Sequence, residues 1–165
     1  MYVTKLQKNT IPTVMMIWGV MFMSLGIYLV VAYMIMNYGN YQPTFSKDIL
    51  EQSLLGALDV KSTAYLVSFM IFWGAFFYFK KGLHKLKEEV RSLNILDKEE
   101  RFQEFSKKYL TLMFITLALF EAIMIIGIIM FLTALSFKSL LFLTVIAAVG
   151  FIIVMPNKTK FEEYL

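Results

Sequence analysis

The sequence predicts an all-α integral membrane protein, a four-helix bundle that forms a single membrane domain over residues 1–165. Hydrophobic residues make up 59% of the chain and charged residues only 17%, whereas soluble domains are about 45–50% apolar. The uncharged residues are also gathered into long stretches, and about 20 apolar residues in a helix cross a hydrocarbon core about 30 Å thick. Helices are expected because lipid offers an open backbone no hydrogen-bond partner. The expected spans are about 12–37, 63–79, 110–134 and 137–155.

Positive charge is distributed unevenly between the ends of these spans. Of the 16 Lys and Arg residues, nine fall within residues 80–109 and only three at the opposite ends of the spans. Because Lys and Arg mark the cytoplasmic side, we expect residues 80–109 and both termini in the cytoplasm and the loop 38–62 outside. The expected location is the inner membrane of a cell, crossed several times. This topology accounts for the net charge of +4, so we expect a lipid bilayer and no nucleic acid as partner.

The first span is expected to begin near Pro12, which suits a first helical turn. Its apolar stretch is far longer than the core of a signal peptide and shows no small-x-small cleavage pattern, so we expect an uncleaved anchor.

In the outer loop, five apolar residues fall largely on one helical face and predict a short interfacial helix capped by Ser46. This helix either lies in the headgroup layer or folds back on the outer ends of the bundle. The five residues are Ile49, Leu50, Leu54, Leu55 and Leu58.

Residues 80–109 form the only long polar segment of the chain. Apolar residues recur in it at heptad-like spacing, which predicts that the second span continues as a helix beyond the membrane. Asp97 and Glu100 have the spacing of a capping box, so a new helix is expected to start there. The prediction is a cytoplasmic helical hairpin, which is either a solvated elbow or a docking site for a soluble partner. The candidate docking residues are Leu83, Leu86, Val90 and Leu93.

Residue types that carry catalysis and metal binding are scarce. The chain has no cysteine, which excludes disulfides and thiolate metal sites. Its one histidine, His84, falls in the polar segment, so one chain cannot supply a bis-histidine haem site. The 12 methionines are expected as apolar filler rather than as ligands. We therefore expect no metal, no cofactor and no enzymatic activity in this chain.

Spans one and three resemble each other, as do spans two and four. Gly26 aligns with Ala118 in the first pair of spans, and Gly74 aligns with Gly150 in the second. Two such copies would share one orientation in the membrane, so the pattern suggests a parallel duplication of a two-helix unit. Small residues also let membrane helices approach closely. The residues expected at helix–helix contacts are Ala118, Ala122, Gly26, Gly74 and Gly150.

Glu121 is the only charged residue within 110–134. An ionised carboxylate at the bilayer centre costs from about 2.5 to more than 10 kcal/mol, and the sequence offers no cation near the middle of any span to pair with it. We therefore expect a neutral Glu121. It is either structural, hydrogen-bonded across a helix contact, or functional, as a proton or cation site. The candidate hydrogen-bond partners are Tyr28, Tyr33, Ser24, Ser68 and Thr144.

The segment from Leu110 to Leu132, LTLMFITLALFEAIMIIGIIMFL, resembles the carboxylate-bearing second helix of subunit c of rotary ATP synthases. In that family a glutamate followed by alanine precedes an aliphatic stretch that contains glycine. The resemblance covers about 23 of the 165 residues. It implies that Glu121 is the ion-carrying acid, with Ala122 and Gly127 as neighbours. The bulky second span and the long polar segment depart from that family, and the layout as a whole is similar to that of small four-span bacterial membrane proteins.

Two functions follow from these observations. In the first, the chain is a non-catalytic subunit or scaffold of a larger membrane assembly. It would contact further copies of itself or other membrane subunits, and a soluble partner at the hairpin. In the second, it is a component of a small oligomeric proton or cation channel or transporter that uses Glu121.

Overall fold

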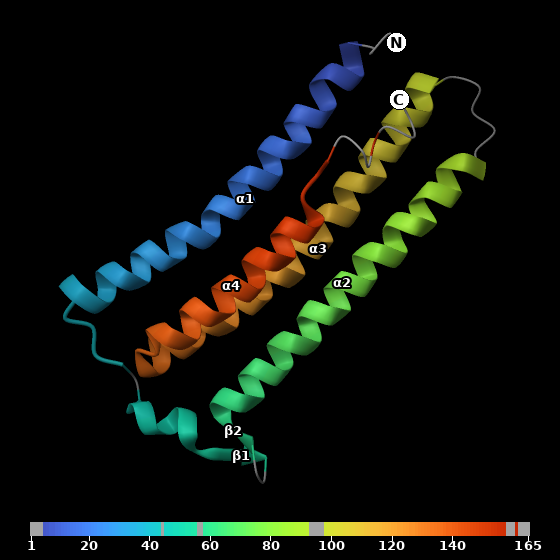
Figure 1. The fold of residues 1–165 in the computed structure, drawn as a ribbon. Coiled ribbons are helices and arrows are strands. Elements are labelled where there is room, and N and C mark those ends of the chain that lie inside the picture. Colours follow the sequence, from blue (N-terminus) through green and yellow to red (C-terminus); the bar gives the residue numbers. More distant parts are fainter. Residues whose placement is uncertain (1–4, 44, 56–57, 93–97, 158–160, 162–165) are drawn as a thin grey trace.

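Four long helices make up most of the protein (Figure 1). The computed structural model describes residues 5–43, 45–55, 58–92, 98–157 and 161. Each α-helix contains a stretch long and apolar enough to cross a membrane. The protein is therefore an all-α four-helix bundle of the multi-pass membrane type, as the sequence predicts. In chain order the elements are α1 (Lys5–Tyr38), the 3-10 helix η1 (Lys47–Glu51), β1 (Ser53–Leu55), β2 (Leu58–Asp59), α2 (Val60–Ser92), α3 (Lys98–Ala134) and α4 (Phe137–Val154).

α3 and α4 form the centre of the bundle, with α1 against one side and α2 against the other (Figure 1). Glycines bring the two central helices close together. A Cβ atom on Gly150 would lie 2.4 Å from Cδ1 of Phe120, and one on Gly127 would lie 3.3 Å from Cα of Leu140. Each α-helix has an apolar stretch of 18 residues, here called its apolar window. Of this window 44% is buried in α3 and in α4, but only 11% in α1 and 17% in α2. α1 and α2 are thus an outer layer, and much of their surface is left to lipid.

The two ends of the bundle differ. One end, here called the loop end, carries η1, β1 and β2 (Figure 1). The other, here called the hairpin end, carries the last turns of α2, the first turns of α3 and the start of α1 (Figure 1). α2 and α3 reach the hairpin end as continuous helices that run through residues 80–92 and 98–109. Glu99 and Glu100 lie in the first turn of α3, where negative charge is favourable; the predicted cap Asp97 lies outside the described residues.

A charge cluster joins α2 and α3 at the hairpin end. The ammonium group of Lys108 donates to Oε1 of Glu89 at 2.6 Å and lies 3.3 Å from Oε1 of Glu104. The hydrogen bond from Lys108, together with its positive charge, holds the pKa of Glu89 below its usual value. The pair therefore stays ionised at neutral pH and bridges the two helices where they leave the apolar core.

Only two residues link α3 to α4. The first, Leu135, has a φ of 50°, in the left-handed region that side chains rarely adopt. In this conformation its N–H donates to the carbonyl of Phe131 at 2.7 Å, and its own carbonyl accepts from the N–H of Phe137 at 3.0 Å. The predicted break between the third and fourth spans therefore coincides with a tight turn that returns α4 along α3.

Long-range hydrogen bonds reach the last carbonyls of both central helices. The hydroxyl of Tyr41 donates to the carbonyl of Leu132, near the end of α3, at 2.7 Å. The indole N–H of Trp18 donates to the carbonyl of Phe151, near the end of α4, at 2.9 Å. Both acceptors are among the last four carbonyls of their helices, which have no partner inside the helix. Trp18 thereby ties α1 to α4.

α1 begins earlier than predicted. It starts at Lys5, so Pro12 lies inside the helix and not in its first turn. Hydrophobic periodicity could not find this start, because the helix begins in polar residues. Membrane helices tolerate an internal proline where neighbouring helices or local adjustments satisfy the freed backbone group.

The predicted interfacial helix in the outer loop is wrong. In the described part of this loop the only helix is the five-residue η1, which is followed by the antiparallel pair β1–β2. Ser46 makes no capping hydrogen bond, and the backbone is already extended at Gln52. The carbonyl of Gln52 then accepts from the N–H of Val60 at 3.1 Å. Strand pairing therefore satisfies backbone groups that the apolar pattern assigned to a helix, while Leu50 still packs into the core.

The structure does not show the duplication that the sequence suggests. α3 packs along α4, but in the described part of the chain α1 and α2 lie on opposite sides of that pair. The aligned glycines also differ, because Gly150 abuts Phe120 whereas a Cβ on Gly74 would meet nothing within 4 Å. The repeat is therefore confined to the sequence pattern.

Gly150→Ala should destabilise the bundle by about 1–3 kcal/mol, because the added methyl group must displace the fully buried ring of Phe120. The measurement is the thermal unfolding midpoint in detergent. Gly19→Ala is the matched control, since Gly19 is also helical but its added Cβ would meet nothing within 4 Å. The control should be neutral or slightly stabilising, and equal midpoints for the two variants would contradict the close α3–α4 contact.

Candidate functional site

Glu121 lies one residue from the centre of the span 110–134 of α3, and its side chain is half-buried. The neighbouring residue, Phe120, marks where other helices contact α3. The ring of Phe72 on α2 lies 5.5 Å from the ring of Phe120, and Gly150 of α4 packs on the same ring. Successive residues of a helix are about 100° apart around the axis. Glu121 therefore lies on the flank of this contact and not within it.

Within the described part of the chain, the carboxyl group of Glu121 has no hydrogen bond and no ion pair. Three hydroxyls expected as its partners instead donate to carbonyls of their own helices at 2.6–2.8 Å; these donors are Ser24, Ser68 and Thr144. Tyr28 and Tyr33 lie exposed on α1. The expected bond across a helix contact is thus not formed inside one chain, and the carboxyl is open to lipid, an ion or another chain.

The five small residues expected at helix contacts have different surroundings. Gly150 lies between α3 and α4, where it makes room for Phe120. A Cβ on Gly26 or Gly74 would meet nothing within 4 Å, and both residues are exposed. Ala118 is exposed and Ala122 is half-buried. Four of the five small residues therefore lie on surfaces that a molecule outside the chain can reach.

The apolar stripe of the hairpin does not face water, so the premise of the predicted docking site is wrong. Val90 is 0% exposed and Leu86 is 5% exposed, and Leu83 is half-buried against the same core. Leu93 lies outside the described residues. The stripe packs α2 against α3 within the chain, which leaves Leu86 and Val90 no free face for a soluble partner.

A cluster of aromatic rings fills the hairpin end. The ring of Phe161 lies 4.9 Å from that of Tyr109, 5.6 Å from that of Phe105 and 6.2 Å from that of Phe102. All four side chains are 0% exposed. The chain beyond α4 thus returns to α3 and is anchored there by one ring. The sequence pattern does not reveal this contact because Phe161 lies between the charged residues Lys160 and Glu162, although three aromatic residues on one face of α3 predict that something covers them.

Phe161→Ala should lower the thermal unfolding midpoint strongly, because truncating a buried phenylalanine costs about 3–5 kcal/mol. Phe114→Ala is the control, since it also removes a phenylalanine ring, but from a position on α3 that is 42% exposed. A shift for Phe161→Ala no larger than that of the control would show that the ring is not anchored.

No group of three or more metal-ligating side chains that could hold a metal ion occurs among the residues that the structure describes. No protein-family model, curated protein or solved structure matches this chain. The function is therefore inferred from the surfaces and the single membrane-embedded carboxyl described above.

Proposed function

We propose that the chain is a non-catalytic subunit of a larger membrane assembly, and that the exposed face of α2 around Gly74 contacts a second copy of the chain or another membrane subunit. The observation that carries this proposal is the open space at Gly74, on a helix that buries only 17% of its apolar window.

The buried and exposed faces of α2 are clearly separated. Ala75 and Phe79 are 1% and 5% exposed, whereas Met70 and Phe77 are 65% and 51% exposed. Gly74 lies on the exposed face between these two large side chains and forms a notch there. Membrane helices associate where small residues allow their backbones to approach. Because Gly74 also lies on the exposed face between two large side chains, a helix from outside the chain can approach closely there.

The proposal includes the orientation of the subunit in the inner membrane of a cell. The hairpin end, where most of the Lys and Arg residues fall, would lie in the cytoplasm together with both termini. The loop end would face outward and would leave the aromatic residues Tyr38 and Tyr41, both exposed, near the headgroups.

In mild detergent, native mass measurement should find the wild-type chain in a homo-oligomer or bound to a second membrane protein. Gly74→Leu should weaken this association by about 1–3 kcal/mol through overpacking, which is about 5-fold to 150-fold in Kd. Gly19→Leu on α1 is the control and should leave the assembly intact. A wild-type chain that is monomeric at every concentration, or an unchanged complex in Gly74→Leu, would count against the α2 interface.

A second function is favoured by the Glu121 carboxyl, which has no hydrogen-bond or ion-pair partner among the residues that the structure describes. We propose, as the alternative, that an oligomer uses this group to take up and release a proton or cation. Because a charged carboxylate in lipid is costly, the group would be neutral where it faces acyl chains. It would ionise only where a neighbouring chain supplies water or a cation. The resemblance to subunit c supports this alternative, since it assigns an ion-carrying role to the same residue.

Glu121→Gln should abolish ion flux through protein reconstituted in vesicles, with a decrease of at least about tenfold, because glutamine keeps the shape of the neutral acid but cannot release a proton. The measurement is proton or cation flux at matched protein density, with oligomer mass as a check on assembly. Glu104→Gln, at the hairpin end, is the control and should retain flux. Flux that is unaffected in Glu121→Gln would exclude the alternative.

A further inference from the structure

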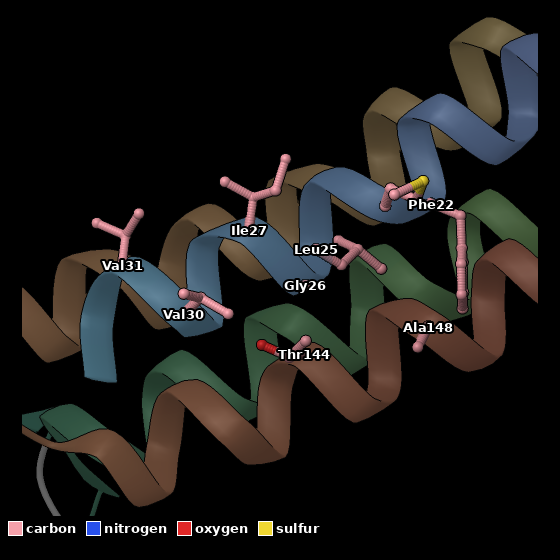
Figure 2. A pocket seen from close by; sticks show the side chains of 9 residues that line it. Phe22, Leu25, Gly26, Ile27, Val30, Val31, Thr144 and Ala148 are labelled. Carbon is pink, nitrogen blue, oxygen red and sulfur yellow. The ribbon is translucent and has the colours of Figure 1, made fainter. Parts of the chain in front are cut away.

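Two cavities lie along the seam between α1 and α4. The first is a groove of about 580 Å³ lined only by residues of these two helices (Figure 2). The second, of about 380 Å³, lies at the loop end, where Met36 of α1 and Phe137 of α4 line it. From Met36 at the loop-end cavity to Phe22 at the far end of the groove, α1 advances by about 21 Å. Since one leaflet with its headgroups is also about 21 Å deep, the two cavities together span the length of one lipid.

The groove is suited to hydrocarbon. Figure 2 shows Leu25 and Val30 of α1 across from Thr144 and Ala148 of α4. The Thr144 hydroxyl is already within hydrogen-bond distance of the Leu140 carbonyl at 2.7 Å and of the Met124 sulfur at 2.8 Å. It therefore offers little to a polar ligand, and the rest of the lining is apolar.

Gly26 deepens the groove, because a Cβ at this position would meet nothing within 4 Å. The missing side chain leaves open space on the face of α1 that lines the groove. A larger side chain at residue 26 would occupy this space.

The cavity at the loop end is suited to an anion. Lys61 and Lys138 line it from the starts of α2 and α4, together with a single carboxylate, Glu51. Asp59, the nearest acid in sequence to Lys61, already accepts the backbone N–H of Ser62 at 2.6 Å. Within the described residues, Lys138 has no ion pair. The balance of charge in the cavity is therefore positive.

The start of α4 adds to this positive potential. Its first turn contains no acidic residue, and the side chain of Ser136 makes no capping hydrogen bond. The positive end of the helix dipole therefore points toward a cavity that already holds the ammonium groups of Lys61 and Lys138.

We propose that the seam binds one phospholipid with an anionic headgroup, with the phosphate between Lys61 and Lys138 and one acyl chain in the groove between α1 and α4. The cationic cavity and the apolar groove follow one another along the same pair of helices, as the headgroup and acyl chain of one lipid do. A transmembrane helix from another protein would fill the groove but would leave the lysines without an anion. A soluble phosphate compound would fill the cavity but not the groove.

Native mass spectrometry of the detergent-solubilised protein with added phosphatidylglycerol or phosphatidylcholine tests the headgroup site. The wild-type chain should bind the anionic lipid more tightly. Replacing Lys61 and Lys138 with Gln should weaken this binding by about fivefold for each lysine removed and leave phosphatidylcholine binding unchanged. Equal binding of the two lipids by the wild-type chain, or no effect of the double variant, would overturn the proposal.

A second arm of the experiment tests the groove and the source of the phosphate. Gly26→Leu should fill the groove and abolish retention of the lipid, whereas Gly19→Leu, on the same helix but outside the groove, should retain it. Glycerol phosphate and inorganic phosphate should not displace the lipid or raise the unfolding midpoint. Stabilisation by either soluble anion equal to that by phosphatidylglycerol, or full lipid retention in Gly26→Leu, would overturn the proposal.

Discussion

The need of helix-end carbonyls for hydrogen-bond donors organises this bundle. The last four carbonyls of a helix have no partner inside it, and lipid cannot replace water as their donor. At the end of α3 the donors include the hydroxyl of Tyr41 and the N–H of Phe45. At the end of α4 they include the indole of Trp18 and the N–H of Met155. The donors from Tyr41, Phe45 and Trp18 join parts of the chain that are far apart in sequence, so satisfying the helix ends also assembles the fold.

These hydrogen bonds explain why the outer helices stay attached to the bundle although they are loosely packed. α1 buries only 11% of its apolar window, yet Trp18 bonds to the end of α4 and stacks on Phe22, which in turn contacts the ring of Phe151. A few specific contacts therefore hold α1, from Trp18 in its middle to Tyr33, whose ring lies 6.5 Å from that of Phe137. Between these contacts α1 leaves a groove along α4. On the other side, α2 turns a glycine notch toward the membrane. The surfaces that support the proposed lipid and subunit contacts are thus consequences of a fold that concentrates its close packing on α3 and α4.

The sequence predicts the spans well because a membrane span is recognised from the composition of about 20 consecutive residues, and lipid tolerates few charges in that length. The break between the third and fourth spans was predicted for the same reason. The outer loop was not, because a pattern of five leucines and isoleucines is too short to distinguish one helical turn from paired strands. The hairpin stripe was identified correctly as apolar, but the residues that cover it come from another helix, which no local pattern reveals.

For the candidate site, the sequence identifies Glu121 as unusual but cannot supply its surroundings. The sequence pattern reveals Glu121 because it is the only charge in its span. The neighbours of its carboxyl depend on the rotation of three helices about their axes, which the sequence does not give. The hydrogen bond of the Trp18 indole was not predicted for a related reason. A tryptophan in an apolar span is expected to pack as a hydrophobic side chain, and the sequence does not identify a carbonyl that its N–H could reach. The glycines show the same limit, because Gly150 and Gly74 have similar sequence contexts and opposite environments.

The most direct measurement compares Trp18→Phe with Trp73→Phe by thermal unfolding in lipid nanodiscs. Both substitutions shorten a tryptophan within a membrane helix, but in the described chain only Trp18 donates its indole N–H to a helix-end carbonyl. If helix-end carbonyls must be satisfied from other helices, Trp18→Phe should lose about 0.5–1.5 kcal/mol more stability than Trp73→Phe. Equal losses in the two variants would contradict the account.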